Sequence, residues 1–412
     1  MRLTLTVSAL ALATAVASPA AAQTATAAAA TEAPAMCPSE LGKKAREALA
    51  GYNDAVTAGD AAKTASARAA AEAAVKTDAE RCVLTQINLN VAVKASDNAG
   101  IAAAIDALAA NPTSTKSQVA PMLLNSAKIK FNQKDYAGAS AMLDRVVAAN
   151  PTAGEAYILL AESRFKTGRQ AEAPALALKA IAAEKAAGRK APEAWYKHAV
   201  AMAFDTKNPQ SVDLAREWVM AYPTSTNWRD ALRILAMDSK LPENDLIDVY
   251  RLQMATKAMA GTADYARFAN LSSKLGYPGE TEAVIKAGIA ANALSASNSE
   301  VSSMLKVATG KVGADKAGLA AATAKAIASG NAKSAMAQGD ANYGYGNYAE
   351  AAKVYRAVAG MSGADVATAN LRLGMALAMS GDKAGAETAL KAVTGPKASL
   401  AQFWLAYANS RA

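Results

Sequence analysis

The chain has 412 residues, a formal net charge of +9 and a sequence pI near 9.3. Hydrophobic residues make up 52% of it and aromatic residues only 5%. Alanine dominates by inspection, and this composition favours helices over β-sheets. One globular core is not expected at this length, because single cores stop growing beyond roughly 250–300 residues. Two cysteines and one histidine cannot supply the four soft ligands of a structural zinc site, which excludes that class of site.

The first segment, residues 1–22, has the pattern of a secretory signal peptide. Arg2 supplies a positive start, residues 3–16 form a short apolar core, and residues 20–22 are small and suited to cleavage. An uncleaved membrane anchor is the alternative interpretation. Cleavage would leave no apolar run long enough to span a membrane, so we expect a periplasmic protein without a transmembrane segment.

Residues 23–36 are of low complexity and are predicted to form a disordered tether. Cys37 follows, but Met36 precedes it and the apolar core lies far upstream, which excludes a lipidated N-terminal cysteine. In an oxidising compartment Cys37 can instead pair with Cys82. A predicted helix at about 38–57 follows Cys37, a second runs back over about 60–75, and Cys82 begins a third, parallel to the first. A disulfide would therefore pin the first helical hairpin to the next; two buried thiols are the alternative.

A spacing pattern recurs along the chain with a period near 34 residues. Apolar and small residues stand three or four positions apart, which places them on one face of a helix. The members are Tyr136, Ala139, Leu143 and Val146, then Gln170, Ala173, Ala177 and Ala180, and near the C-terminus Tyr348, Ala351, Tyr355 and Val358, then Lys383, Ala386, Leu390 and Val393. A period of this length is typical of helix–turn–helix repeats.

The pattern resembles the tetratricopeptide repeat family. The residues that carry the resemblance are Gly346, Tyr348, Ala351 and Tyr355; Asp135, Tyr136, Ala139, Leu143 and Pro151; and Leu160, Ala161, Gly168 and Ala173. The resemblance is most complete over residues 120–187 and 332–395. It implies an all-α, right-handed α-solenoid of about nine or ten helical hairpins. Its segments are degenerate repeats at 37–118, clear repeats at 119–224, degenerate repeats at 225–330, and clear repeats with a C-terminal capping helix at 331–412.

Two short stretches allow other interpretations. Residues 344–349 match G-x-G-x-x-G/A, the pattern of a dinucleotide-binding loop, but no strand-like run precedes them. We therefore predict that Gly346 ends a helix at positive φ and that Tyr348 begins the next. Residues 86–93 alternate as in a strand, yet their flanks are helical, and we predict a helix there too.

No pattern of catalytic residues is found, and we expect no cofactor and no enzymatic activity. His198, the only histidine, is expected to be a packed or half-exposed helix residue. Residues 125–200 hold 12 Lys and Arg against 7 Asp and Glu, but a periplasmic location argues against nucleic acid as the partner.

With the signal-peptide pattern, we expect a non-enzymatic scaffold of the Gram-negative periplasm. The resemblance implies that it binds a partner peptide or helix in a concave groove. The partner is expected to be another envelope protein, through an acidic or extended segment. Family resemblance places seven residues in the groove: Lys128, Phe131, Glu162, Phe165, Lys166, Tyr196 and Phe204. A soluble binding component for an envelope glycan or another anionic polymer is the alternative function.

Phe131 and Phe165 are 34 residues apart, and Tyr343 is equivalent in a distant repeat. Both phenylalanines could instead be core residues, because a one-residue slip of the helix would bring them inside. The usual core place holds Lys130 and Arg164, which would be costly to bury.

Overall fold

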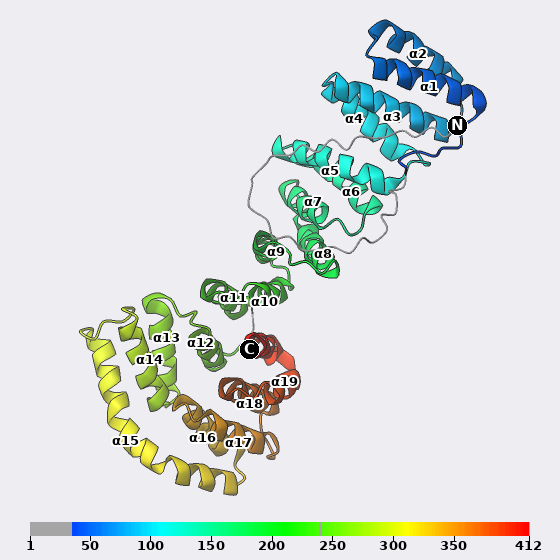
Figure 1. Cartoon of the computed structure of the whole chain (residues 1–412). Helices are drawn as coiled ribbons and strands as arrows, with labels where there is room; N and C mark the ends of the chain where they lie inside the picture. Colours follow the sequence, from blue (N-terminus) through cyan, green and yellow to red (C-terminus); the bar gives the residue numbers. More distant parts are fainter. Residues whose placement is uncertain (1–34, 239–240, 412) are drawn as a thin grey trace, which may run out of the picture. The chain divides into compact units, whose positions relative to one another are not determined.

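The computed structural model describes residues 35–238 and 241–411. The predicted signal peptide, 1–22, and most of the predicted tether, 23–36, lie outside these residues. The described residues form 20 α-helices and no strand, which confirms the all-α solenoid of helical hairpins. The chain divides into two compact units, residues 1–168 and 169–412 (Figure 1).

Unit 1 is a stack of antiparallel helices in which consecutive helices pack on each other, except that α3 packs on α1 rather than on α2. Its helices are α1 (Lys43–Ala58), α2 (Ala61–Ala74), α3 (Asp78–Lys94), α4 (Asn98–Ala110), α5 (Lys116–Asn132), α6 (Tyr136–Ala149) and α7 (Gly154–Lys166). The alternating stretch at 86–93 is part of α3, as predicted.

Unit 2 contains the remaining thirteen α-helices. They are α8 (Ala173–Ala186), α9 (Glu193–Asp205), α10 (Ser211–Ala221), α11 (Ser225–Asp238), α12 (Leu246–Ala255), α13 (Gly261–Lys274), α14 (Pro278–Ala290), α15 (Ser299–Ala328), α16 (Ala332–Gly344), α17 (Tyr348–Ala359), α18 (Val366–Ser380), α19 (Lys383–Lys391) and α20 (Ala398–Ser410). Short 3₁₀ turns occur at Gln170–Glu172, Glu243–Asp245 and Gly395–Lys397.

Small residues set the distance between the helices of a hairpin. Ala139, Ala173, Ala351 and Ala386, the repeated alanines of the sequence pattern, are all fully buried. Where the facing residue is larger, the partner helix carries glycine. A Cβ on Gly339 would lie 2.5 Å from the ring of Tyr355. The period in the sequence is therefore the period of close helix contacts.

Unit 2 differs from an open stack because its last helix returns to its earlier ones. Figure 1 shows α12 to α20 arranged as a ring, and α20 packs against α10 and α18. The ring of Phe403 meets that of Trp228 edge-to-face, with centroids 6.2 Å apart. The buried Trp404 donates its indole N–H to the backbone carbonyl of Asp248, at 3.1 Å. The C-terminal helix thus closes the unit as well as capping it.

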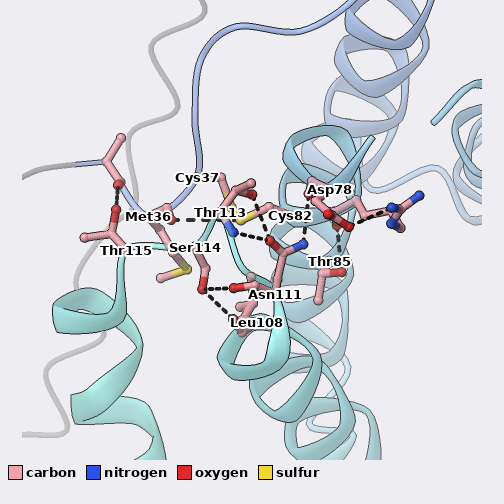
Figure 2. Close-up of a disulfide and its surroundings, with 12 residues drawn as sticks. Met36, Cys37, Asp78, Cys82, Thr85, Leu108, Asn111, Thr113, Ser114 and Thr115 are labelled. Atoms are coloured by element: carbon pink, nitrogen blue, oxygen red, sulfur yellow. Dashed lines mark hydrogen bonds and ion pairs between the residues drawn. A yellow bond between two sulfur atoms is a disulfide. The ribbon is translucent and has the colours of Figure 1, made fainter. Parts of the chain in front are cut away.

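The structure contains the disulfide between Cys37 and Cys82, with the two Cα atoms 5.7 Å apart. Figure 2 shows that it ties the segment before α1 to the first turns of α3. Beside it, the backbone N–H of Thr115 donates to the Met36 carbonyl, and the Thr115 hydroxyl donates to the Ala35 carbonyl. The last two residues of the predicted tether are therefore held against the start of α5.

Reduction of the disulfide should destabilise unit 1 by about 4 kcal/mol, because it frees a loop of some 45 residues in the unfolded chain. All four tryptophans, Trp195, Trp218, Trp228 and Trp404, lie in unit 2. Urea unfolding followed by circular dichroism should consequently shift on reduction, while tryptophan fluorescence should not. A shift of the fluorescence transition alone would contradict this assignment.

The Gly346→Ala substitution should destabilise unit 2 by about 1 kcal/mol, because Gly346 has φ +79° between α16 and α17. Gly313→Ala is the matched control. Gly313 lies inside α15 with no atom near its would-be Cβ, so alanine there should stabilise by about 0.5–1 kcal/mol. Tryptophan-monitored urea unfolding measures both, and effects of the same sign would refute the predicted difference.

Candidate functional site

The predicted phenylalanines lie near the ends of α5 and α7, which pack on each other. Phe131 and Phe165 are both half-buried, so each ring keeps part of its surface in solvent. The ring of Phe131 rests edge-to-face on Tyr136, with centroids 5.2 Å apart. The usual core positions hold Lys130, paired with Asp135, and Arg164, paired with Asp144. We call Lys128, Phe131, Glu162, Phe165 and Lys166 the α5–α7 strip.

Charged side chains of the α5–α7 strip connect its two helices. Lys128 on α5 forms an ion pair with Glu155 on α7, at 2.5 Å. Glu162 is half-buried, and Lys166 is exposed at the end of α7. The strip therefore offers two partly exposed rings beside lysine side chains.

The last two residues predicted for the groove belong to α9 of unit 2. Tyr196 is only 8% exposed, and its ring packs edge-to-face on Tyr222, with centroids 5.9 Å apart. Helix packing thus covers most of the Tyr196 ring, unlike the rings of Phe131 and Phe165. Phe204 is half-buried, and the lone His198 is exposed on the same helix.

Tyr343, the counterpart of Phe131 in the repeat, shows where this position points. It packs on Tyr348 as Phe131 packs on Tyr136, with ring centroids 5.0 Å apart. Tyr343 is only 5% exposed, and the guanidinium of Arg251 lies 4.7 Å from its ring centre. In unit 2 this position thus faces the interior of the closed ring of helices.

The interior of unit 2 holds a buried charged cluster that sequence reasoning missed. Its members come from α12, α14, α16 and α18, and none is more than 7% exposed: Asp248, Arg251, Glu280, Asp340 and Arg372. Arg251 binds Glu280 through two hydrogen bonds of 2.8 Å and Asp248 through a third. Arg372 binds Asp248 at 3.1 Å and Asp340 at 2.7 Å. The two arginines therefore connect the opposite sides of the ring.

Three carboxylates and two guanidinium groups leave one negative charge in excess. Tyrosine hydroxyl groups stabilise this charge by donating hydrogen bonds to a carboxylate. Tyr277 and Tyr355 both donate to Asp340, at 2.7 and 2.8 Å. Burial, followed by the nearby Asp340 carboxylate, raises the pKa of both tyrosines above the usual range. Burial alone would lower the pKa of Arg372, but the carboxylates of Asp248 and Asp340 outweigh it, and the pKa is raised.

A signal for the cluster was present in the sequence. Arg372 is the only charged residue in α18, a helix that is otherwise buried and apolar along most of its length. A lone arginine in such a helix needs a buried carboxylate as partner. Its partners, Asp248 and Asp340, lie 124 and 32 residues away, so no local spacing identifies them.

The glycine-containing motif is a turn between helices. α16 ends at Gly344 and α17 begins at Tyr348, and no strand precedes them. Gly346 has φ +79°, as predicted. A Cβ on Gly344 would lie 3.0 Å from that of Glu280, and the Tyr345 hydroxyl donates to Asp315 at 2.6 Å. Gly344 thus allows α16 to pack closely on α14, and Tyr345 joins the end of α16 to α15.

Neither a metal site nor a membrane-crossing helix is found in the described part of the chain. Residues 35–238 and 241–411 contain no group of three or more His, Cys, Asp or Glu side chains suited to a metal ion. No helix in these ranges combines the length and the apolar character that crossing a membrane requires.

Residues 124–194 and 336–401 match the family model described as tetratricopeptide repeat. Both segments are therefore similar to tetratricopeptide repeats. Together they make up about a third of the chain. They coincide with the two regions where the pattern of the sequence is most complete.

Solved structures give similar but distant matches. One is the structure of Naa15/Naa10 bound to HypK-THB, at 12% identity and a TM-score of 0.28, covering 86% of this chain and 65% of that chain. Another is the crystal structure of the P58(IPK) TPR domain, at 14% identity and a TM-score of 0.22, covering 82% of this chain and 98% of that one. The chain therefore spans about two thirds of the first of these relatives. No curated protein matches the sequence.

The Arg372→Met substitution should destabilise unit 2 by about 3–5 kcal/mol, because it leaves Asp248 and Asp340 buried without one of their cations. Lys391→Met is the control, since it breaks an exposed pair with Glu387 and should cost only about 0.3–0.5 kcal/mol. Urea unfolding followed by tryptophan fluorescence measures both. A change of less than about 1 kcal/mol for Arg372→Met would show that the cluster contributes little.

Proposed function

We propose that this protein is a non-enzymatic periplasmic scaffold that binds an extended or helical segment of another envelope protein across the α5–α7 strip. Tetratricopeptide-type helical repeats generally mediate protein–protein interaction, and the matched segment 124–194 includes the whole strip. The binding mode would be a partner segment lying across two neighbouring helices of the stack.

The exposure of Phe131 and Phe165 is the observation that carries the proposal. Their counterpart in unit 2, Tyr343, is covered by the charged cluster of the closed ring. The two phenylalanines are half-buried instead, and both keep surface in solvent. Partly exposed aromatic rings at a repeated position are suited to anchoring a partner, because such rings contribute most where they become buried on binding.

The charges beside the rings support an acidic partner. Lys166 is exposed next to Phe165. Lys128 is one turn from Phe131 and also forms an ion pair with Glu155. Lysines at the rim of an apolar contact mainly increase the rate of encounter with an acidic segment.

The disulfide supports the periplasmic location. Cys37 and Cys82 are paired and mostly buried. Disulfides persist in oxidising compartments such as the bacterial periplasm and are rare in the cytosol. The pairing agrees with the signal-peptide pattern at residues 1–22, which points to export independently.

A photo-crosslinking amino acid at position 131 or 165 tests the site in intact cells. We expect a defined crosslinked protein, identified by mass spectrometry, and loss of that product in the Phe131→Ala/Phe165→Ala variant. Position 129 is the matched control, because Ile129 lies on α5 two residues before Phe131 and is 58% exposed. A crosslinker at 129 should not give the same product.

The folded state of the alanine variant must be checked by circular dichroism, because unit 1 contains no tryptophan. Preserved melting with lost capture supports the strip. Destabilisation by about 3 kcal/mol or more per ring would assign the rings to the core. Unchanged melting with unchanged capture would reject the proposal.

A further inference from the structure

A cleft opens in unit 2 between the turn that joins α13 to α14 and the middle of α15. Its volume is about 580 Å³, and its walls include Tyr277 and Pro278 from the turn and Val307, Lys311, Ala314 and Asp315 from α15. Val307 is 55% exposed, which leaves an apolar surface open in the cleft. A cleft that combines apolar walls with a lysine is suited to a side chain with a neighbouring carboxylate.

The face of α15 that carries Val307 and Lys311 extends beyond the cleft. Residues on this face recur at spacings of four and three, and all are exposed: Val307, Lys311, Ala314, Gly318, Ala321 and Lys325. We call these six residues the α15 strip. Lys311 and Lys325 are 14 residues apart, or about 21 Å along the helix axis. Figure 1 shows α15 (yellow) as a long, curved helix beside α13 and α14. The strip is thus a run of small residues between two lysines.

Glycine at position 318 is not explained by packing within unit 2. A Cβ there would meet no atom within 4 Å, and the same holds for Gly310 and Gly313 on this helix, so nothing in the described structure requires these glycines. In a helix interior, glycine is less favourable than alanine. It does allow another chain to approach the helix closely.

The charges on α15 are unbalanced. Four lysines, Lys306, Lys311, Lys316 and Lys325, are exposed, against two acids, Glu300 and Asp315. Lys316 lies over the ring of Tyr345, and Asp315 accepts the hydroxyl of the same tyrosine. Lys311 and Lys325 form no ion pair within residues 35–238 and 241–411. Both lysines of the α15 strip can therefore bind carboxylates of a partner molecule.

We propose that the cleft and the α15 strip bind an acidic segment of a partner protein, with an apolar side chain against Val307 and carboxylates on Lys311 and Lys325. Charge complementarity selects the acidic partner. The exposed valine and the proline and tyrosine walls select a protein segment over a purely anionic polymer, which would use the lysines alone. This site is distinct from the α5–α7 strip, so the two can fail independently.

Fluorescence anisotropy with the full chain and a labelled peptide of alternating glutamate and leucine tests the proposal. The Lys311→Glu/Lys325→Glu variant should bind the peptide at least about tenfold more weakly than the unmodified chain. Lys333→Glu/Lys383→Glu is the matched control, because it makes the same change of charge at two other exposed lysines of unit 2. Val307→Ser should weaken binding as well, at all salt concentrations. The Phe131→Ala/Phe165→Ala variant should bind normally.

If the two lysine double variants weaken peptide binding equally, the effect comes from overall charge, and the proposal is overturned. Unchanged binding in Val307→Ser would assign the surface to anionic polymers and overturn the proposal too. So would displacement of the peptide by a heparin oligosaccharide, with equal loss in the two lysine variants and Val307→Ser. Tryptophan fluorescence checks that each unit 2 variant is folded.

Discussion

The pairing of Arg372 with Asp248 and Asp340 is the interaction on which the architecture of unit 2 depends. It joins α18 to α12 and α16, while Arg251 joins α12 to α14. Buried ion pairs contribute little net stability over apolar residues of the same shape, but removing one member is expensive. The cluster therefore disfavours any arrangement in which the helices separate. An open stack would leave three carboxylates and two guanidinium groups to find other partners. The apolar contacts of α20, through Phe403 and Trp404, hold the same ring shut.

This closure affects where the protein can bind a partner. In unit 2 the inward repeat position, Tyr343, is covered by Arg251, so the interior is filled by the chain itself. In unit 1 the same position holds Phe131 and Phe165, which stay partly in solvent. One repeat motif thus serves two purposes, as a core contact and as a proposed anchor. Binding by unit 2 would then use its outer surface, where α15 presents unpaired lysines beside a cleft.

Local features of the sequence predicted much of this structure, and non-local ones were missed. The repeated alanines and Gly346 could be placed because helix packing has a fixed period and a positive φ favours glycine. The disulfide could be predicted because antiparallel helices alternate in direction and bring Cys37 and Cys82 to the same end. The charged cluster could not be predicted, because its members are brought together only when the helices of unit 2 close into a ring. The burial of Tyr196 is non-local in the same way, because its ring packs on Tyr222, at the end of the next helix.

Native-state hydrogen exchange of α20 tests the closed ring most directly. The helix is close to the end of the chain, and the last helix of an open solenoid should fray with a low local free energy. If α20 closes the ring, its amides should exchange with the same free energy as those of α12 and α18, which is that of unfolding the whole unit. Exchange of α20 at a clearly lower free energy, with α12 and α18 still protected, would contradict the account.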